Sequence, residues 1–382
     1  MPPASKPSPQ SLPSNSYPPG DLHTAYKHCL RLESHTGWNF TQDASSEVLM
    51  HGMTPAVTAR ILGYGLCLAP NDAGRNALVR DIIACGEDPE LLAGLGYLYA
   101  FGLIRVFFNP KGPTPAVTPS LTPTLSLEAA AQNPHLVKPS SSNASDLRKL
   151  TLLRDNYRCV FTGGIDKESV QQAADVDPSA PLATTNVAHI ISQSLSDNIT
   201  GTTPAVHAKF DWTKTAGAIL ERFGGFAAHA VLGGDNLHSP KNAFTSSFEP
   251  HSEFDNLDLW LTPAKDAQGQ VIPDTYDVNH CYGLEYLRRL VYHVKPQIVF
   301  RSLPLGDQVI PAPDPDIIAL HAACARIAHM SGAAEYLREL YRDVDNIAVM
   351  TEPNAAYELS RALKTLQVAT ATVPADSDQQ QS

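Results

Sequence analysis

The chain has 382 residues, a mass of 41.2 kDa and a formal net charge of −11, from 28 Lys and Arg against 39 Asp and Glu. Hydrophobic residues make up 43% of the chain, enough to bury a core, which excludes disorder of the whole chain. The acidic balance also excludes a broadly basic nucleic-acid coat, so that contact with DNA or RNA would need a local basic patch.

The N-terminal segment, residues 1–20, is rich in Pro and Ser and lacks the apolar run of a signal peptide, so we expect it to be disordered and the protein not to be secreted. The six cysteines lie far apart and form no Cys-x-x-Cys pair. This spacing argues against a disulfide scaffold or a cysteine-rich zinc finger and favours a reducing compartment. We therefore expect an intracellular protein, cytoplasmic or nuclear.

A helical N-terminal domain is expected over residues 21–108, where Leu78, Ile82 and Cys85 recur at helical spacing. Its last stretch, residues 91–108, is apolar apart from Arg105. The charge shortens the clean apolar run below the length of a membrane span, so a buried helix of a bundle is the favoured interpretation and no membrane partner is expected. Residues 109–145 are rich in Pro, Ser and Thr and are expected to form a linker.

A helix is predicted to begin at Ser145 or Asp146, and it carries the basic cluster of the middle of the chain. The residues of this cluster are Arg148, Lys149, Arg154 and Arg158. They are candidate phosphate-binding residues, with a solvated helix face as the alternative of equal weight.

Two predicted strands and a helix follow. The segment TTNVAHIISQS predicts a β-branched strand with His189 near its end, and Asn242 lies at the start of a second predicted strand. Pro250 is expected to be the first residue of a helix, on which His251 and Asp255 stand at i and i+4. Side chains at this spacing lie on one face, so that an imidazole and a carboxylate can hold one divalent cation.

These motifs together resemble the HNH nuclease family, in particular the branch found in many uncharacterised fungal proteins. They are R-D-x-x-R-C-V-F-T-G, then A-H-I, then an Asn nine residues before H-x-x-x-D, and they lie within residues 146–280. The resemblance implies a ββα-metal fold, in which two strands and a helix surround one cation. It also implies an endonuclease that hydrolyses phosphodiester bonds of DNA or RNA.

The resemblance assigns a role to each matching residue. His189 corresponds to the general base that takes a proton from the attacking water, and an imidazole suits this role near pH 7. Asn242 corresponds to the residue that holds the loop between the strands and orients the base. His251 and Asp255 correspond to the metal ligands.

The chain departs from the family pattern before the general base, where Ala188 stands at a position that often holds a ligand. Two protein ligands then remain, which suits Mg²⁺, with Mn²⁺, Ni²⁺ or Zn²⁺ as alternatives. The Cys-x-x-Cys knuckle of many members is reduced to Cys159 and Thr162, so no second metal is expected. A long insertion, residues 192–240, is expected to contain a helix over residues 211–223.

The C-terminal region, residues 281–368, is expected to be helical and to pack on the HNH-like core, followed by a disordered tail over residues 369–382. Asp314 and Pro315 predict a capped helix start. His321 and His329 share a similar face of that helix, but no carboxylate completes a ligand spacing along it, so packed or surface imidazoles are favoured over a metal site.

The sequence thus predicts an α+β chain, mainly helical, with a central ββα-metal core and a long insertion. The favoured function is a metal-dependent HNH-type endonuclease with nucleic acid as its partner, and the oligomeric state is left open. Residues 146–280 hold 10 Lys and Arg against 17 Asp and Glu, a net charge of 10 − 17 = −7. Because a nuclease that grips a duplex is usually basic, two alternatives stand: a small-molecule enzyme on the same scaffold, or a non-catalytic binding module.

Overall fold

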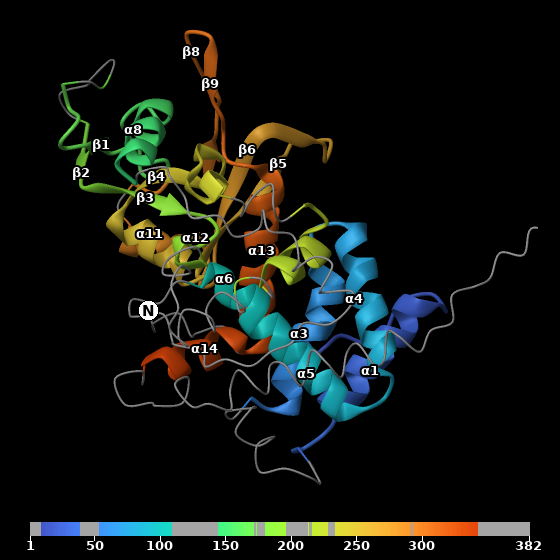
Figure 1. The fold of residues 1–382 in the computed structure, drawn as a ribbon. Helices are drawn as coiled ribbons and strands as arrows, with labels where there is room; N and C mark the ends of the chain where they lie inside the picture. The colour runs from blue at the N-terminus through green and yellow to red at the C-terminus, as the bar shows by residue number, and fades with distance from the viewer. Residues whose placement is uncertain are drawn as a thin grey trace, which may run out of the picture.

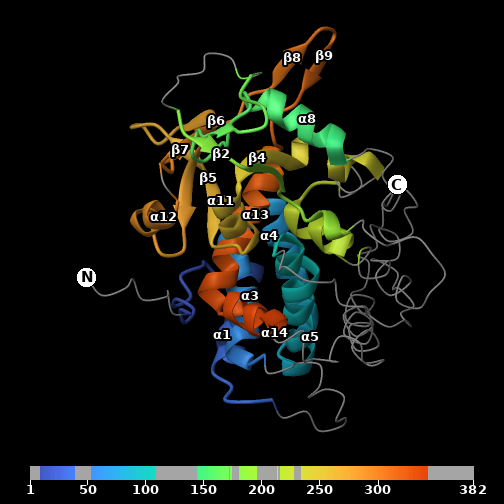
Figure 2. The same cartoon turned by 90° about the vertical axis from the view of Figure 1, so that its left-hand side faces the viewer.

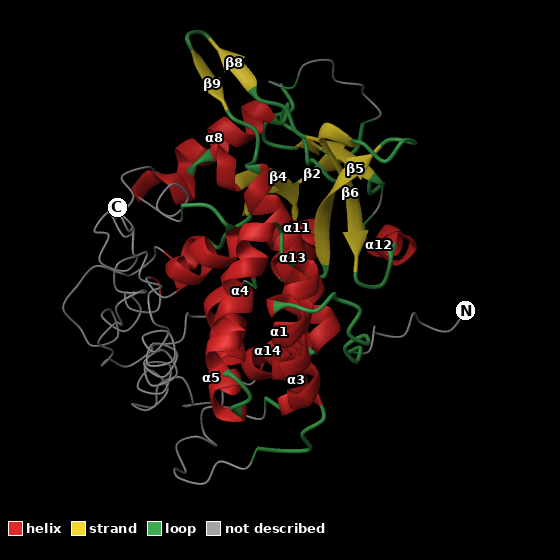
Figure 3. Cartoon of the chain, turned by 90° about the vertical axis from the view of Figure 1, so that its right-hand side faces the viewer, coloured by secondary structure: helices red, strands yellow, loops and turns green. Residues whose placement is uncertain are grey.

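The computed structural model places a bundle of helices beside a mixed region of short strands and helices (Figure 1). The residues that it describes are 9–38, 53–108, 144–171, 173, 180–195, 213, 216–227, 234–291 and 293–342. Helix α13 (Pro315–Ser331) runs from one part into the other and packs on both α3 and β5 (Figures 1 and 3). The chain is therefore α+β, as predicted.

Consecutive helical segments build the N-terminal part. They are α1 (Asp21–Glu33), α3 (Pro55–Leu68), α4 (Asp72–Cys85), α5 (Pro89–Tyr99), the π-helical turn η1 (Ala100–Ile104) and α6 (Arg105–Phe107). The side chains of Thr54, Asn71 and Asp88 accept hydrogen bonds from the first turns of α3, α4 and α5. Each cap satisfies a backbone N–H that the helix itself cannot pair.

The run from α5 to α6, Pro89–Phe107, is the one helix among the described residues that is long and apolar enough to cross a membrane. Its apolar window is 83% buried inside the protein. The Arg105 side chain is buried and donates to the carbonyl oxygen of Phe108 at 2.7 Å, so even its charge lies inside the fold. This stretch forms part of the helical core, which confirms the interpretation of residues 91–108 as a buried helix of a bundle.

The segment that we expected to be disordered, residues 1–20, is in part ordered. From residue 9 onward it packs on the helices, because Leu12 is buried and the backbone N–H of Gln10 donates to Met330 O at 2.9 Å. The Tyr64 hydroxyl also donates to the carbonyl oxygen of Ser11 at 2.8 Å. Composition marked this segment as loose, but one buried leucine and these hydrogen bonds hold it. The expected linker 109–145 lies almost wholly outside the described residues, and the tail 369–382 entirely so.

The central region pairs two strands that are far apart in the sequence. Strand β3 (Thr185–His189) lies antiparallel to β4 (Ala243–Ser247), with His189 opposite Ala243 and Thr185 opposite Ser247. Helix α11 (Phe248–Asp255) follows β4 directly and packs on both strands. The helix begins two residues before Pro250, where we expected it to start. Figure 2 shows β4, α11 and α13 side by side.

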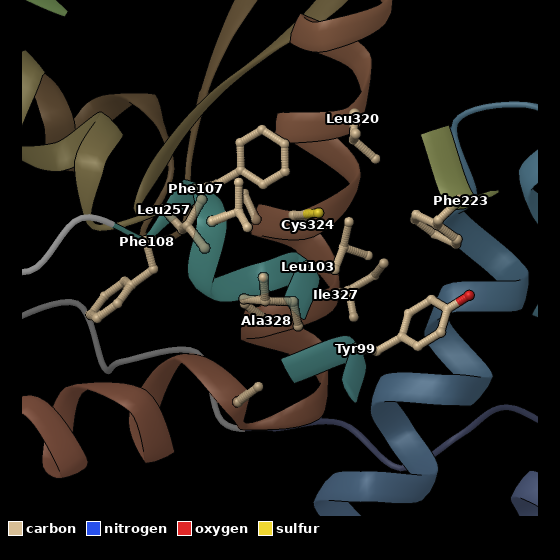
Figure 4. Close-up of a cluster of buried hydrophobic side chains, with 14 of the residues drawn as sticks. Tyr99, Leu103, Phe107, Phe108, Phe223, Leu257, Leu320, Cys324, Ile327 and Ala328 are labelled. Atoms are coloured by element: carbon tan, nitrogen blue, oxygen red, sulfur yellow. The ribbon is translucent and has the colours of Figure 1, made fainter. Parts of the chain in front are cut away.

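Shorter elements surround this pair of strands. They are α8 (Ala144–Arg154), β1 (Ile165–Asp166), β2 (Leu182–Ala183), η2 (Gln193–Leu195), η3 (Gly234–His238) and η4 (Pro240–Asn242). The helix expected over residues 211–223 is described in part, and residues 216–224 are helical. Its Phe223 ring packs edge-on against Tyr99 of α5, which ties the insertion to the helical bundle (Figure 4).

Strands that were not predicted follow α11: two lie in residues 259–280, and three more lie in the C-terminal region, residues 281–368, which is therefore not wholly helical as predicted. A three-stranded antiparallel sheet joins β5 (Leu259–Lys265), β6 (Val271–His280) and β7 (Gln297–Val299), and α12 (Leu284–Leu290) lies between β6 and β7 in the chain. The hairpin of β8 (Leu303–Leu305) and β9 (Gln308–Ile310) follows. Short strands separated by proline and glycine carry little periodicity, which explains why we missed them.

Helix α13 and the following α14 (Ala333–Arg342) match the prediction more closely. Asp314 caps α13, and Gly332 ends it in the left-handed conformation at φ 90°. Figure 4 shows Leu320, Cys324 and Ile327 of α13 facing Leu103 and Tyr99 across the core. His321 is 1% exposed and stacks on Phe254 of α11 with a centroid distance of 3.8 Å.

Burial lowers the pKa of His321 to about 3, so the ring is neutral in the folded protein. In the unfolded chain an ordinary histidine binds a proton below about pH 6.5. Between these two values the unfolded state binds more protons, so stability is lost as the pH falls. We predict a loss of about 1.4 kcal/mol per pH unit from this residue between pH 6.5 and 4.

Urea unfolding at several pH values tests this prediction with the variant His321→Gln. The slope of unfolding free energy against pH should be smaller in this variant than in the wild type, whatever its stability at pH 7. The exposed His35 provides the matched control, and His35→Gln should keep the wild-type slope. Equal slopes in all three proteins would contradict the account.

Candidate functional site

The pairing of β3 with β4 places His189 at the end of a strand. Its neighbour Ala188 is completely buried, and alternation along the strand sends the His189 side chain to the other face. Directly after His189 the chain is held by a hydrogen bond from the Ile190 N–H to the carbonyl oxygen of Asn242 at 2.8 Å. The imidazole thus projects from backbone that is fixed on both sides.

Asn242 is completely buried and joins the exit of β3 to the segment before β4. Its Oδ1 accepts from the N–H of Ile191 at 2.8 Å, and its Nδ2 donates to the carbonyl oxygens of Ile191 and Leu237, both at 3.0 Å. The Asn242 amide therefore holds the backbone at two places: at Ile191, two residues after His189, and at Leu237, the residue before His238. The role that the resemblance implies for Asn242, orienting a general base, stays a prediction.

Helix α11 brings together the two predicted metal ligands. His251 Nε2 lies 3.4 Å from Asp255 Oδ2, and each side chain is about one-fifth exposed, at 20% and 21%. Both groups are therefore reachable from solvent while the helix holds their spacing. One imidazole and one carboxylate can bind a hydrated divalent cation and leave several positions for water.

The structure adds His238, the last residue of η3, which the sequence analysis missed. Its ring is perpendicular to that of His189, with the centroids 5.6 Å apart. His189 Nε2 and His238 Nδ1 are both buried, and neither has a hydrogen-bond partner among the described residues. The only sequence feature that points to His238 is its position four residues before Asn242. Its approach to His189 depends on the path of the long insertion, which the sequence does not predict.

The pKa of His189 is lowered to about 4, first by burial and then by the charges that His238 and His251 would carry. The imidazole is therefore neutral at pH 7, as a proton acceptor must be. It is also a weaker base than the ordinary histidine that we assumed. Helix α11, which carries His251, packs on β3, which carries His189.

The predicted phosphate-binding cluster does not form as a group. Arg154 is wrong as a phosphate contact, because its side chain is completely buried and pairs with Asp155 at 2.8 Å. Its guanidinium also donates to the carbonyl oxygens of Pro240 and Ala243 at 2.7 and 2.8 Å. Arg154 therefore ties α8 to both ends of the segment that carries Asn242.

The other three basic residues have different surroundings. Arg148 donates to the carbonyl oxygen of Thr185 at 2.7 Å and pairs with the buried carboxylate of Asp166 at 3.3 Å. Arg158 donates to Gly163 O at 3.1 Å. Lys149, with a side chain that is 76% exposed, pairs with Asp146 one turn before it, whose side chain is 63% exposed. Of the predicted cluster, Lys149 is the cation best placed to meet a phosphate.

A second group of potential ligands lies beyond the C-terminal end of α11. Ligand atoms of Asp258, Cys281 and His329 all lie within 4.8 Å of one another, the one such group of three among the described residues. This group could hold a metal ion. Along its own helix His329 has no carboxylate at ligand spacing, as the sequence indicated, but the fold brings Asp258 to it.

Comparisons with protein-family models, curated proteins and solved structures find no match for this chain.

The Arg154 network predicts a large effect on stability. Arg154→Ala removes the charged partner of the buried Asp155 carboxylate, which keeps its hydrogen bond from the Thr245 N–H, and a donor to the carbonyls of Pro240 and Ala243. We therefore expect a loss of about 3–5 kcal/mol in the free energy of unfolding. Lys149→Ala, on the same helix but exposed, is the control and should change it by no more than about 0.5 kcal/mol. Chemical denaturation measures both, and similar values for the two variants would contradict this assignment.

Proposed function

We propose that the chain is a metal-dependent HNH-type endonuclease with a ββα-metal core, which hydrolyses phosphodiester bonds of DNA or RNA. The observation that carries this proposal is the arrangement of β3, β4 and α11. It holds His189 at a strand end, Asn242 behind that strand end, and His251 with Asp255 on the following helix. The order and chemistry of these residues are those that the sequence resemblance implies.

His189 is the proposed general base. Its neutral imidazole can accept a proton at Nε2, the nitrogen that is buried and has no hydrogen-bond partner among the described residues. Asn242 fixes the backbone that follows the base and so limits the directions in which the ring can turn. His238 forms one wall of the same site, and its ring restricts His189 from the side.

His251 and Asp255 are the proposed ligands of one divalent cation, and Mg²⁺ fits this donor set best. Ala188 is buried and offers no donor, so two protein ligands leave room for waters and a phosphate oxygen, which Mg²⁺ tolerates well. When bound, the cation would neutralise negative charge that develops on the phosphate and its leaving oxygen. His189 itself stays free to take the proton.

One observation favours a second candidate, an enzyme of the same scaffold that acts on a small phosphodiester or other small molecule. Residues 146–280 carry a net charge of −7, and the burial of Arg154 removes one of the few cations that could have met a nucleic-acid backbone. A long polyanion is repelled by such a surface far more than a small substrate is. The proposed chemistry at His189 is the same in both cases.

Plasmid nicking with Mg²⁺, Mn²⁺ or Ni²⁺ tests the proposed function. His189→Ala should lower the nicking rate by about 10²- to 10⁴-fold, because the attacking water loses its proton acceptor. His251→Ala should raise the metal concentration needed for half-maximal activity. A small chromogenic phosphodiester, assayed in parallel, separates the two candidates, since activity on it without nicking favours the small-molecule enzyme.

The exposed His35, which lies on the N-terminal part, is the matched control, and His35→Ala should behave as wild type in both assays. Unchanged cleavage by His189→Ala, or cleavage that persists in a chelator, would rule out this mechanism. Absence of cleavage of either substrate with every metal would instead leave the fold as a binding module.

A further inference from the structure

Three side chains of different chemistry meet beyond the end of α11, and none of them is among the residues proposed for catalysis. Asp258 lies in the turn between α11 and β5, Cys281 directly follows β6, and His329 lies on the last turns of α13. These elements are distant in the sequence, but the structure packs α11 and α13 against β5 (Figures 1 and 3). The group is therefore a product of the tertiary fold.

Two of the distances within this group are close to those of a tetrahedral zinc site, and all three ligand atoms lie within 4.8 Å of one another. Asp258 Oδ1 lies 3.2 Å from Cys281 Sγ and 3.2 Å from His329 Nε2. Zinc bonds of about 2.0–2.1 Å to oxygen or nitrogen and about 2.3 Å to sulfur place neighbouring ligands about 3.3–3.5 Å apart in a tetrahedron. Small side-chain movements would bring all three atoms into the coordination sphere of one ion.

We propose that Asp258, Cys281 and His329 bind one Zn²⁺ ion at a site distinct from the cation site of α11. A thiolate and an imidazole are the donors that zinc prefers over Mg²⁺ or Ca²⁺, and a carboxylate completes a common donor set. Three protein ligands leave a fourth position for water. This site does not depend on the proposed nuclease activity.

The backbone around the site is held in place by interactions that need no metal. The N–H of Cys281 donates to the carbonyl oxygen of Asp258 at 2.8 Å, and the N–H of Asp258 donates to Glu253 O at 2.8 Å. Leu257, at a left-handed φ of 60°, buries its side chain beside Phe107 in the core (Figure 4). The ligands are thus presented by fixed backbone, which lowers the entropy cost of binding an ion.

Without a metal, two groups share the Asp258 carboxylate with His329. The Arg338 guanidinium of α14 pairs with Oδ1, and the Cys281 thiol donates to the same oxygen at 3.2 Å. Arg338 also donates to the carbonyl oxygen of Asn256 at 3.2 Å, a contact it can keep when it leaves Oδ1. Binding of Zn²⁺ forms a bond from sulfur to the metal, and the thiol proton passes to solvent. His329 Nε2, which donates to the carbonyl oxygen of Leu257 at 3.0 Å in the metal-free protein, gives up this hydrogen bond and its proton moves to Nδ1, so that Nε2 can bind the ion.

Titration with Co²⁺, a spectroscopic substitute for Zn²⁺, tests this site. We expect one equivalent of Co²⁺ to give a near-ultraviolet thiolate-to-cobalt charge-transfer band together with the visible bands of a tetrahedral ion. Cys281→Ser should abolish the charge-transfer band. Cys67→Ser is the matched control, because Cys67 is also partly buried, and it should keep the band.

Zinc should also raise the melting temperature of the wild-type protein. At a free concentration 100-fold above the dissociation constant, the expected rise is about 5–10 °C for a folded unit of this size. Cys281→Ser should lose most of this rise while melting near the wild-type temperature without metal, which shows that the variant folds. No charge-transfer band in the wild type, or a band that survives in Cys281→Ser, would overturn the proposal.

The same variants separate this proposal from the proposed function. The site on α11 contains no sulfur, so the charge-transfer band does not report on it. His251→Ala should keep the band, and Cys281→Ser should keep the wild-type activity in nicking. An intact band in a protein that cleaves nothing would overturn the nuclease proposal alone, and cleavage without a band would overturn the zinc site alone.

Discussion

The burial of α13 is the constraint on which the rest of this structure depends. The helix packs on α3 of the helical part and on β5 of the sheet, so that one apolar core is continuous between regions far apart in the chain. Leu320, Cys324 and Ile327 are almost fully buried there. Full burial of a leucine or isoleucine stabilises a fold by about 1.5–3 kcal/mol, and a helix buried on most sides cannot be moved without loss of several such contributions. The position of the ββα arrangement against the helices follows from this core.

Above that core, two buried polar side chains shape the candidate site. Arg154 and Asn242 satisfy backbone groups of the segment from Leu237 to Ala243, and each joins it to an element from another part of the chain. A buried polar group is costly unless it is paired, so these contacts specify one path for the chain rather than merely adding stability. Because this path is fixed, His189 and His238, from opposite ends of the long insertion, lie side by side. Burial lowers the pKa of His189, so that its ring is neutral at pH 7.

The two parts of the candidate site differ in electrostatic character. The strand end offers the buried, neutral imidazole of His189, whereas α11 offers an imidazole and a carboxylate that solvent can reach. Proton transfer and cation binding make opposite demands, since a base must stay free of the metal and a ligand must face it. The second ligand group, formed around Asp258, takes part neither in the proposed proton transfer nor in the proposed cation binding by α11. It lies where α13 and α14 meet the turn after α11, so an ion there would join elements instead of meeting a substrate.

Local patterns in the sequence were sufficient for the helix cap at Asp314, for the order of strand, strand and helix, and for the facing pair His251 and Asp255. Each of these depends on residues within a few positions of one another, which the backbone geometry of a helix or strand brings together directly. The burial of Arg154, the approach of His238 to His189 and the meeting of Asp258 with Cys281 and His329 were decided only by the tertiary structure. Nothing within an element specifies which distant surface will cover it, because that depends on how the whole apolar area of the chain is buried.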